Sequence, residues 1–223
     1  MKQKKILEPT INAISWKKLL ADPEKHWQDG YSAKMTAESW EAANDIPKEI
    51  VNALNNNEQF RNAELLMAIP EFKVSLPGGT RPSQNDLLVL ISNEIGLTVI
   101  TIEAKAKEDF GPLISDWLQD NSKGKRERLE YILKEINFKS KECLSLRYQL
   151  FHRLASAVIM AKKFHARNAL MVIQSFIESD EDNHFKDFEK FVNAYDQTST
   201  KERPIKVGKS GDVDIYVMWV HSK

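Results

Sequence analysis

A glutamate and a lysine, two positions apart, follow an apolar run rich in β-branched residues in the segment LTVITIEAKAKEDF, residues 97–110. If that run is a strand, Glu103 and Lys105 point to the same face, because side chains alternate along a strand. This pair could serve a metal ion and a phosphate, or it could be the solvated end of a strand. The spacing alone does not decide, because Glu71 and Lys73 repeat it.

An aspartate one run earlier favours the chemical interpretation. Asp86 opens the apolar run DLLVLIS, and the linker NEIG is short enough to join that run to LTVITIEAK in a hairpin. The start of one hairpin strand lies beside the end of the next, so Asp86 is expected near Glu103. Because no such aspartate lies upstream of Glu71 and Lys73, we expect those two to be surface residues.

Two carboxylates held together repel each other unless a cation lies between them, and Mg²⁺ prefers such oxygen ligands. Asp86 and Glu103 are therefore candidate ligands of Mg²⁺ or Mn²⁺. Glu64, expected on a preceding helix, is the candidate third ligand. Lys105 would orient or deprotonate a metal-bound water, or stabilise the transition state of phosphoryl transfer.

The segment LRYQLFHRLASAVIMAKKFH predicts a helix whose polar stripe consists of Gln149, His152, Arg153 and Ser156. The stripe could be a solvated face. Alternatively it could line the site beside Lys105, with Gln149 fixing a water or a ligand, Arg153 holding a phosphate and His152 contacting one. Residues 121–153 carry nine basic and four acidic side chains. That basic region could contact nucleic-acid phosphates, or it could be an exposed helix with Glu–Lys pairing.

The elements that must position these residues follow from the hydrophobic pattern. Residues up to Pro70 are predicted to be helical, with a helix ending at that proline. Three strands are expected at 71–76, 86–92 and 97–105, followed by helices from Phe110. A strand at NALMVIQSF, a helix at DEDNHFKDFEKFVNAY and a closing strand at DVDIYVMWV complete the order. This order predicts an α/β or α+β class with a central mixed sheet.

Composition restricts the class of protein. Lys plus Arg and Asp plus Glu both number 32 among 223 residues, so charge gives no global sign of a nucleic-acid or membrane partner.

One cysteine, Cys143, excludes an intramolecular disulfide and suits the cytoplasm, where we expect the protein. No apolar run suits a secretory signal after the basic segment MKQKKILEPT, and none approaches a membrane span. Walker-type phosphate loops, zinc-ligand sets and serine nucleophile elbows are absent from the sequence, and a homodimer is left open.

The order Glu64, Asp86, Glu103-Ala104-Lys105, helix, strand resembles the PD-(D/E)xK phosphodiesterase superfamily, which has the restriction-endonuclease-like fold. The resemblance covers roughly residues 58–178, and LRYQLFHRLASA with EAKAKEDFGPLISDW is similar to a bacterial branch without an established activity. It implies a Mg²⁺-dependent phosphodiesterase with Asp86 and Glu103 as ligands and Lys105 as the catalytic lysine. Asn85 stands where the motif name has proline. Gln149 matches a Gln-x-x-x-Tyr motif of exonuclease branches, but Arg153 replaces its tyrosine.

The resemblance further implies a core at residues 58–223 with helical decoration at 1–57, together in one compact domain. Two functions remain open at this point: a metal-dependent nuclease acting on nucleic acid, and the same fold used without turnover as a binding module. A third alternative is that Asp86, Glu103 and Lys105 form a structural ion pair in an unrelated α/β fold.

Overall fold

The computed structural model describes residues 9–177 and 183–223. Most of the basic segment at 1–10 lies outside the described residues, as does the beginning of the helix expected from Asp180. In the part that is described, no helix is long and apolar enough to cross a membrane.

Six strands of the described chain form one mixed sheet in the order β1-β2-β3-β4-β6-β5. Their bounds are Glu64–Val74 (β1), Ser83–Asn93 (β2), Gly96–Lys105 (β3), Asn168–Ser175 (β4), Ile205–Ser210 (β5) and Val213–His221 (β6). The first three are an antiparallel meander, β4 and β6 run parallel to β3, and β5 is antiparallel to β6. The predicted mixed sheet with its meander is confirmed.

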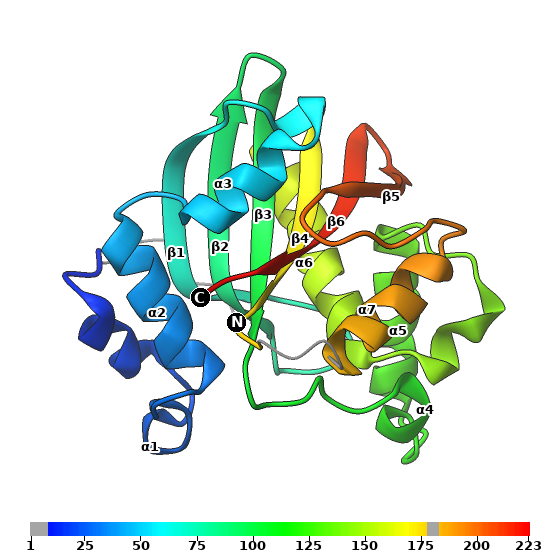
Figure 1. Cartoon of the computed structure of the whole chain (residues 1–223). Coiled ribbons are helices and arrows are strands. Elements are labelled where there is room, and N and C mark those ends of the chain that lie inside the picture. The colour runs from blue at the N-terminus through cyan, green and yellow to red at the C-terminus, as the bar shows by residue number, and fades with distance from the viewer. Residues whose placement is uncertain (1–8, 178–182) are drawn as a thin grey trace.

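Helices cover both faces of this sheet, and Figure 1 shows α3 in front of the strands and α6 behind them. The N-terminal elements are η1 (Ala13–Leu19), α1 (Pro23–His26), α2 (Ser32–Ala43), α3 (Lys48–Asn55) and η2 (Glu58–Phe60). The later helical elements are α4 (Ile114–Trp117), α5 (Lys123–Glu135), η3 (Lys141–Ser145), α6 (Tyr148–Phe164) and α7 (Asn183–Asn193). The expectation of helices before residue 57 and after Phe110 is confirmed.

The two faces bury separate apolar clusters. Residues of α2 and α3, with Trp16 and Phe60, pack on strand residues such as Leu87, Ile100 and Val172. Residues of α5, α6 and α7 pack on the opposite face. Every residue of β4 is buried, as expected for a central strand covered on both sides. The sheet is therefore sandwiched between helices, and the polar groups buried within it are exceptions that need a reason.

The region that contains Glu64 was predicted incorrectly. Residues expected in a helix that ends at Pro70 instead form β1, a strand at the edge of the sheet with a bulge between Leu65 and Met67. Apolar residues that fit a helical period belong here to a strand that is covered poorly: Leu66 is 55% and Met67 40% exposed. A proline is tolerated in such an edge strand.

The backbone of Glu71 changes which face of β1 each side chain takes. Its φ angle is +53°, in the left-handed region that side chains rarely adopt. Ile69 packs on the face covered by α6, and so do Phe72 and Val74, although strict alternation would place 69 and 72 on opposite faces. The prediction that Phe72 and Val74 share a face is confirmed, and the irregularity that begins at Glu71 is new.

Candidate functional site

Three carboxylates lie in a row across the meander, near the end of β3. The β2–β3 register pairs Leu87 with Ile102, and one residue further along it places Asp86 opposite Glu103. The register of β1 with β2 places Glu71 opposite Asp86. A backbone contact holds the middle carboxylate, because Oδ2 of Asp86 accepts a hydrogen bond of 2.7 Å from the amide of Ala104. The predicted approach of Asp86 to Glu103 thus follows from the hairpin.

Glu103 is the centre of a buried ion-pair network. Glu103 is only 2% exposed, and its neighbours Lys105 and Arg153 are 4% and 8% exposed. Oε1 accepts hydrogen bonds of 2.6 Å from Nζ of Lys105 and 2.6 Å from Nε2 of Gln149. Oε2 accepts one from Nε of Arg153. Both oxygens of this carboxylate are therefore engaged by donors from β3 and α6.

The polar stripe of α6 faces the sheet and not the solvent. Gln149 and Arg153 bind Glu103, while His152 lies beside Ser83 of β2, with 2.8 Å between Nδ1 and Oγ. Ser156 donates to the same Ser83 oxygen over 2.9 Å. The solvated-face alternative is therefore wrong, and the stripe is the surface through which α6 is joined to the site.

His152 lies behind the network. Burial lowers its pKa well below the ordinary value, and the neighbouring Arg153 lowers it further, so the ring is neutral. The hollow that Gln149 and Arg153 line does not include His152. This position suits support of Arg153 better than the phosphate contact expected from the sequence.

The three carboxylates differ in their electrostatics. Burial raises the pKa of Glu71 to about 7, and it raises the pKa of Asp86 well above its ordinary value, with further upward contributions from Glu103 and Glu71. Burial alone would also raise the pKa of Glu103, but Arg153 and Lys105 outweigh it and hold that pKa below the ordinary value. Glu103 is ionised, while its two neighbours carry protons more readily.

A hollow of about 280 Å³ opens over this row. Its strand and α6 residues are Glu71, Gln84, Asp86, Glu103, Lys105, Gln149 and Arg153. Its other wall belongs to the N-terminal helices and to the segment after β3, with Leu20, Ala21, His26, Ser32, Ala33, Glu108 and Asp109. Glu108 joins these two parts, because its Oε1 accepts hydrogen bonds from the amide and the hydroxyl of Ser32. The N-terminal helices thus contribute directly to the candidate site.

Glu64 does not belong to this group. It stands at the first position of β1, pairs with Ser92 and lines a different hollow near the β2–β3 turn. Asp86 and Glu103 lie at the opposite end of the meander. The prediction that Glu64 is the third metal ligand is wrong, because it depended on a helix that is a strand.

The third carboxylate of the row is Glu71, which was expected on the surface. It is half-buried, and its Oε2 accepts a hydrogen bond of 2.6 Å from Nε2 of Gln84. A signal was present in the sequence: the pairing of EFKVSL with the strand that begins near Asp86 would have placed Glu71 beside Asp86. The repeated Glu-x-Lys spacing concealed it, because one copy was treated as coincidence.

A model of a domain of unknown function, DUF6946, matches residues 9–223 of the chain. The chain belongs to the DUF6946 family. No curated protein and no solved structure matches it. The matched range includes the N-terminal helices as well as the sheet, so both walls of the hollow lie within the DUF6946 domain.

The donor chemistry of the DUF6946 site fits a hard divalent cation, since three carboxylates face one hollow. Among the described residues, however, no group of three His, Cys, Asp or Glu side chains is arranged to hold a metal ion. Both oxygens of Glu103 already bind other side chains, those of Lys105, Gln149 and Arg153. A cation could therefore use Glu103 only after one of these contacts opens.

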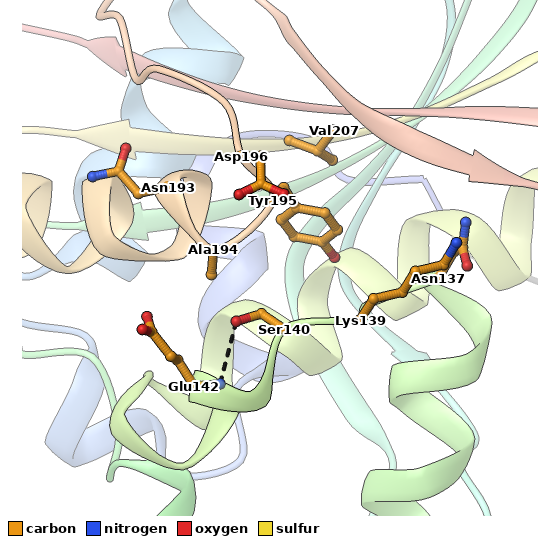
Figure 2. Close-up of a pocket in the computed structure, with 9 residues that line it drawn as sticks. All are labelled: Asn137, Lys139, Ser140, Glu142, Asn193, Ala194, Tyr195, Asp196 and Val207. Carbon is orange, nitrogen blue, oxygen red and sulfur yellow. Dashed lines mark hydrogen bonds between the residues drawn. The ribbon is translucent and has the colours of Figure 1, made fainter.

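A second hollow of about 510 Å³ lies away from this site, between the end of α5, the end of α7 and β5 (Figure 2). Tyr195 lines it and donates a hydrogen bond to the carbonyl of Ile136. Burial raises the pKa of that tyrosine well above its ordinary value, so the hydroxyl stays protonated. We interpret this tyrosine as structural and assign no chemistry to the hollow.

Proposed function

We propose that this protein is a Mg²⁺-dependent phosphodiesterase that hydrolyses nucleic-acid phosphodiester bonds, with a restriction-endonuclease-like core of the PD-(D/E)xK type. The observation that carries the proposal is the meeting of Asp86, Glu103 and Lys105 at one end of the meander, in a hollow that also contains Gln149 and Arg153. The single free cysteine agrees with a cytoplasmic site of action.

In this proposal, each side chain of the chain has a separate task. Lys105 approaches from β3 and bears the positive charge that would orient an attacking water or stabilise the charge that develops on the phosphate. Arg153 would hold a phosphate oxygen through its planar guanidinium group. Gln149 would orient Glu103, and its own Oε1 is held by the amide of Gly111 at 3.2 Å. Lys105 and Arg153 are buried and Gln149 is partly buried, and their hydrogen bonds hold their directions before substrate arrives.

Asp86, Glu103 and Glu71 are the residues that would hold the cation. When bound, Mg²⁺ or Mn²⁺ supplies Lewis acidity and lowers the pKa of a coordinated water. The raised pKa values of Asp86 and Glu71 agree with this role, because carboxylates that are costly to ionise in an empty site regain stability beside a cation.

Nucleic acid is the proposed substrate because the basic stretch at residues 121–153, which ends at Arg153 in the hollow, has exposed members. Lys123 and Arg126 of α5, with Lys139 and Lys141, are exposed. Other basic residues of that stretch already make contacts within the protein: Arg128 donates to the carbonyl of Pro77, and Arg153 binds Glu103. The sequence count of nine basic residues therefore overstates the charge available for phosphates.

One observation favours a second function, a binding module of the same fold without turnover. The Glu103 carboxylate is saturated by Lys105, Gln149 and Arg153, as in a structural ion-pair network. A buried charge of this kind is strongly stabilised only when its partners are complete. If those contacts never open, the site holds the fold together and performs no chemistry.

Calorimetric titration with Mn²⁺ separates these functions. The proposal expects binding by the wild type, at least tenfold weaker binding by Asp86→Asn and Glu103→Gln, and unchanged binding by Glu64→Gln, which serves as the matched control. Equal binding by the wild type and by Glu103→Gln would count against the metal site.

Cleavage assays then test turnover. Single-stranded DNA, duplex DNA, RNA and bis(p-nitrophenyl) phosphate are incubated with Mg²⁺ or Mn²⁺, and Lys105→Ala is the inactive control. We expect loss of activity by a factor of at least about 10² in that variant, the usual size of a lost electrostatic contribution. Cation binding without hydrolysis of any of these substrates would support the binding module.

A further inference from the structure

Arg153 is held from two sides. On the side of the hollow its Nε donates to Oε2 of Glu103. Behind it, Nη1 lies 3.3 Å from Oγ of Ser83 and 3.3 Å from Nδ1 of His152. These supports fix the guanidinium group in the orientation that covers one oxygen of Glu103.

The position that Arg153 covers is the one a cation would need. Oε1 of Glu103 already accepts hydrogen bonds from Lys105 and Gln149, so Oε2 is the oxygen with a single donor. A divalent ion beside Oε2 would also meet the positive charge of the guanidinium group at short range. The contact between Arg153 and Glu103 therefore competes with metal binding.

We infer that Arg153 acts as a latch on Glu103, which a substrate phosphate releases by drawing the guanidinium group away, so that phosphodiester and divalent cation bind cooperatively. This inference rests on the proposed function. Arg153 lines the hollow, so an entering phosphate can reach it. A phosphate can offer the guanidinium group two oxygens at once, whereas Glu103 now offers it only Oε2.

The charges in the hollow support cooperative binding. Glu71, Asp86, Glu103, Glu108 and Asp109 outnumber the basic residues Lys105 and Arg153. Phosphate alone can reach Arg153 but binds weakly beside these carboxylates, and a cation alone would have to displace Arg153. Together the two ligands satisfy both sets of charges, which is the condition for a positive coupling free energy.

The first test uses the wild-type protein, Mn²⁺ and a ten-nucleotide DNA strand with phosphorothioate linkages, which resist hydrolysis. We expect the strand to tighten Mn²⁺ binding by about tenfold, and Mn²⁺ to tighten binding of the strand by the same factor, because coupling is reciprocal. A neutral methylphosphonate strand of the same sequence should not produce the effect. A coupling factor of one would overturn the inference.

The second test asks whether Arg153 is the cause, since a phosphate that coordinates the metal directly would also give coupling. Arg153→Lys keeps the charge but cannot make the contacts to Glu103, Ser83 and His152 together. We expect this variant to bind Mn²⁺ alone several-fold more tightly than the wild type and to show a smaller coupling factor. Lys162→Met, which removes a positive charge from the same helix, should match the wild type. Equal Mn²⁺ affinity in Arg153→Lys and wild type would refute the latch.

A third measurement needs no variant to fold. In the ¹⁵N spectrum of the wild type, the Nε–H signal of Arg153 should shift when the phosphorothioate strand is added with all metal chelated, and an unshifted signal would contradict the latch. Failure of the proposed function looks different, because neither Mn²⁺ nor the strand would then bind. Binding of both ligands without coupling would refute the latch and leave the proposed function standing.

Discussion

At the scale of single residues, the site shows that two copies of the Glu-x-Lys spacing can differ completely in their surroundings. Glu103 is ionised and held by three donors, whereas burial raises the pKa of Glu71 to about 7. Hairpin geometry predicted that Asp86 lies near Glu103 and Lys105, and helical spacing offered an inward position of Gln149 and Arg153 as one of two alternatives. Glu71 was overlooked because its strand was not paired with the strand that begins near Asp86. The left-handed backbone at Glu71, by contrast, has no signature in local sequence.

The raised pKa of Glu71 predicts how stability depends on pH. Its pKa rises from 4.5 to about 7 on folding, so the folded state binds more protons than the unfolded state between these values. Stability is therefore lost as pH rises through this window. Glu71→Gln should raise the free energy of unfolding by about 1–3 kcal/mol at pH 8, with little effect near pH 4.

Urea denaturation of the wild type and Glu71→Gln at several pH values measures this difference. Glu64→Gln, at an exposed position of the same strand, is the control and should follow the wild type throughout. A gain that stays constant from pH 4 to pH 8 would show that ionisation of Glu71 is not its source.

At the scale of elements, prediction failed at the edges of the sheet. The inner strands β2, β3, β4 and β6 were predicted because their apolar runs are buried on both faces. The first part of the outer strand β1, up to Pro70, was mistaken for a helix, although its end was predicted as a strand, and β5 was missed. Each outer strand has one neighbour and a bulge, so its side chains need not follow a regular alternation. An apolar pattern in the sequence reflects burial of the side chains, and the edge strands are buried too little to produce a clear pattern.

The loop between β1 and β2 offers a prediction at this scale. It approaches α5 so closely that a Cβ added to Gly78 would lie 2.0 Å from the carbonyl oxygen of Gly124, and the φ angle of Gly78 is +74°. Gly78→Ala should therefore destabilise the fold by about 2 kcal/mol or more. Because the loop leads into Ser83, which supports Arg153, Mn²⁺ binding should change as well.

Thermal unfolding of Gly78→Ala measures this cost. Gly208→Ala is the matched control, because a Cβ at that position meets nothing within 4 Å. Equal melting temperatures for the two variants would mean that the loop can move away from α5 without loss.

At the scale of the whole molecule, the N-terminal helices form one of the two layers on the sheet. Trp16, Trp40, Ile50 and Phe60 belong to the apolar cluster on that face. Trp40 also donates a hydrogen bond of 3.1 Å from Nε1 to the buried Gln174 of β4. The division into decoration at 1–57 and core at 58–223, expected from the resemblance, does not account for the part that this layer plays in the hydrophobic core.

Removal of residues 1–57 should therefore prevent folding of the remainder. It would expose one whole face of the sheet, including Leu87, Ile100 and Val172, which are now at most 1% exposed. We expect the fragment 58–223 to aggregate on expression. A soluble fragment 58–223 with a cooperative unfolding transition would refute this expectation.

The irregular edges of the sheet also bear on how the protein behaves at high concentration. An open edge strand presents unpaired backbone groups that another molecule can extend into a fibril. On β1 the bulge between Leu65 and Met67 and the missing amide hydrogen of Pro70 interrupt that row, and on β5 a bulge between Lys206 and Gly208 does the same. The features that hid both strands from sequence analysis thus guard the molecule against self-templated aggregation.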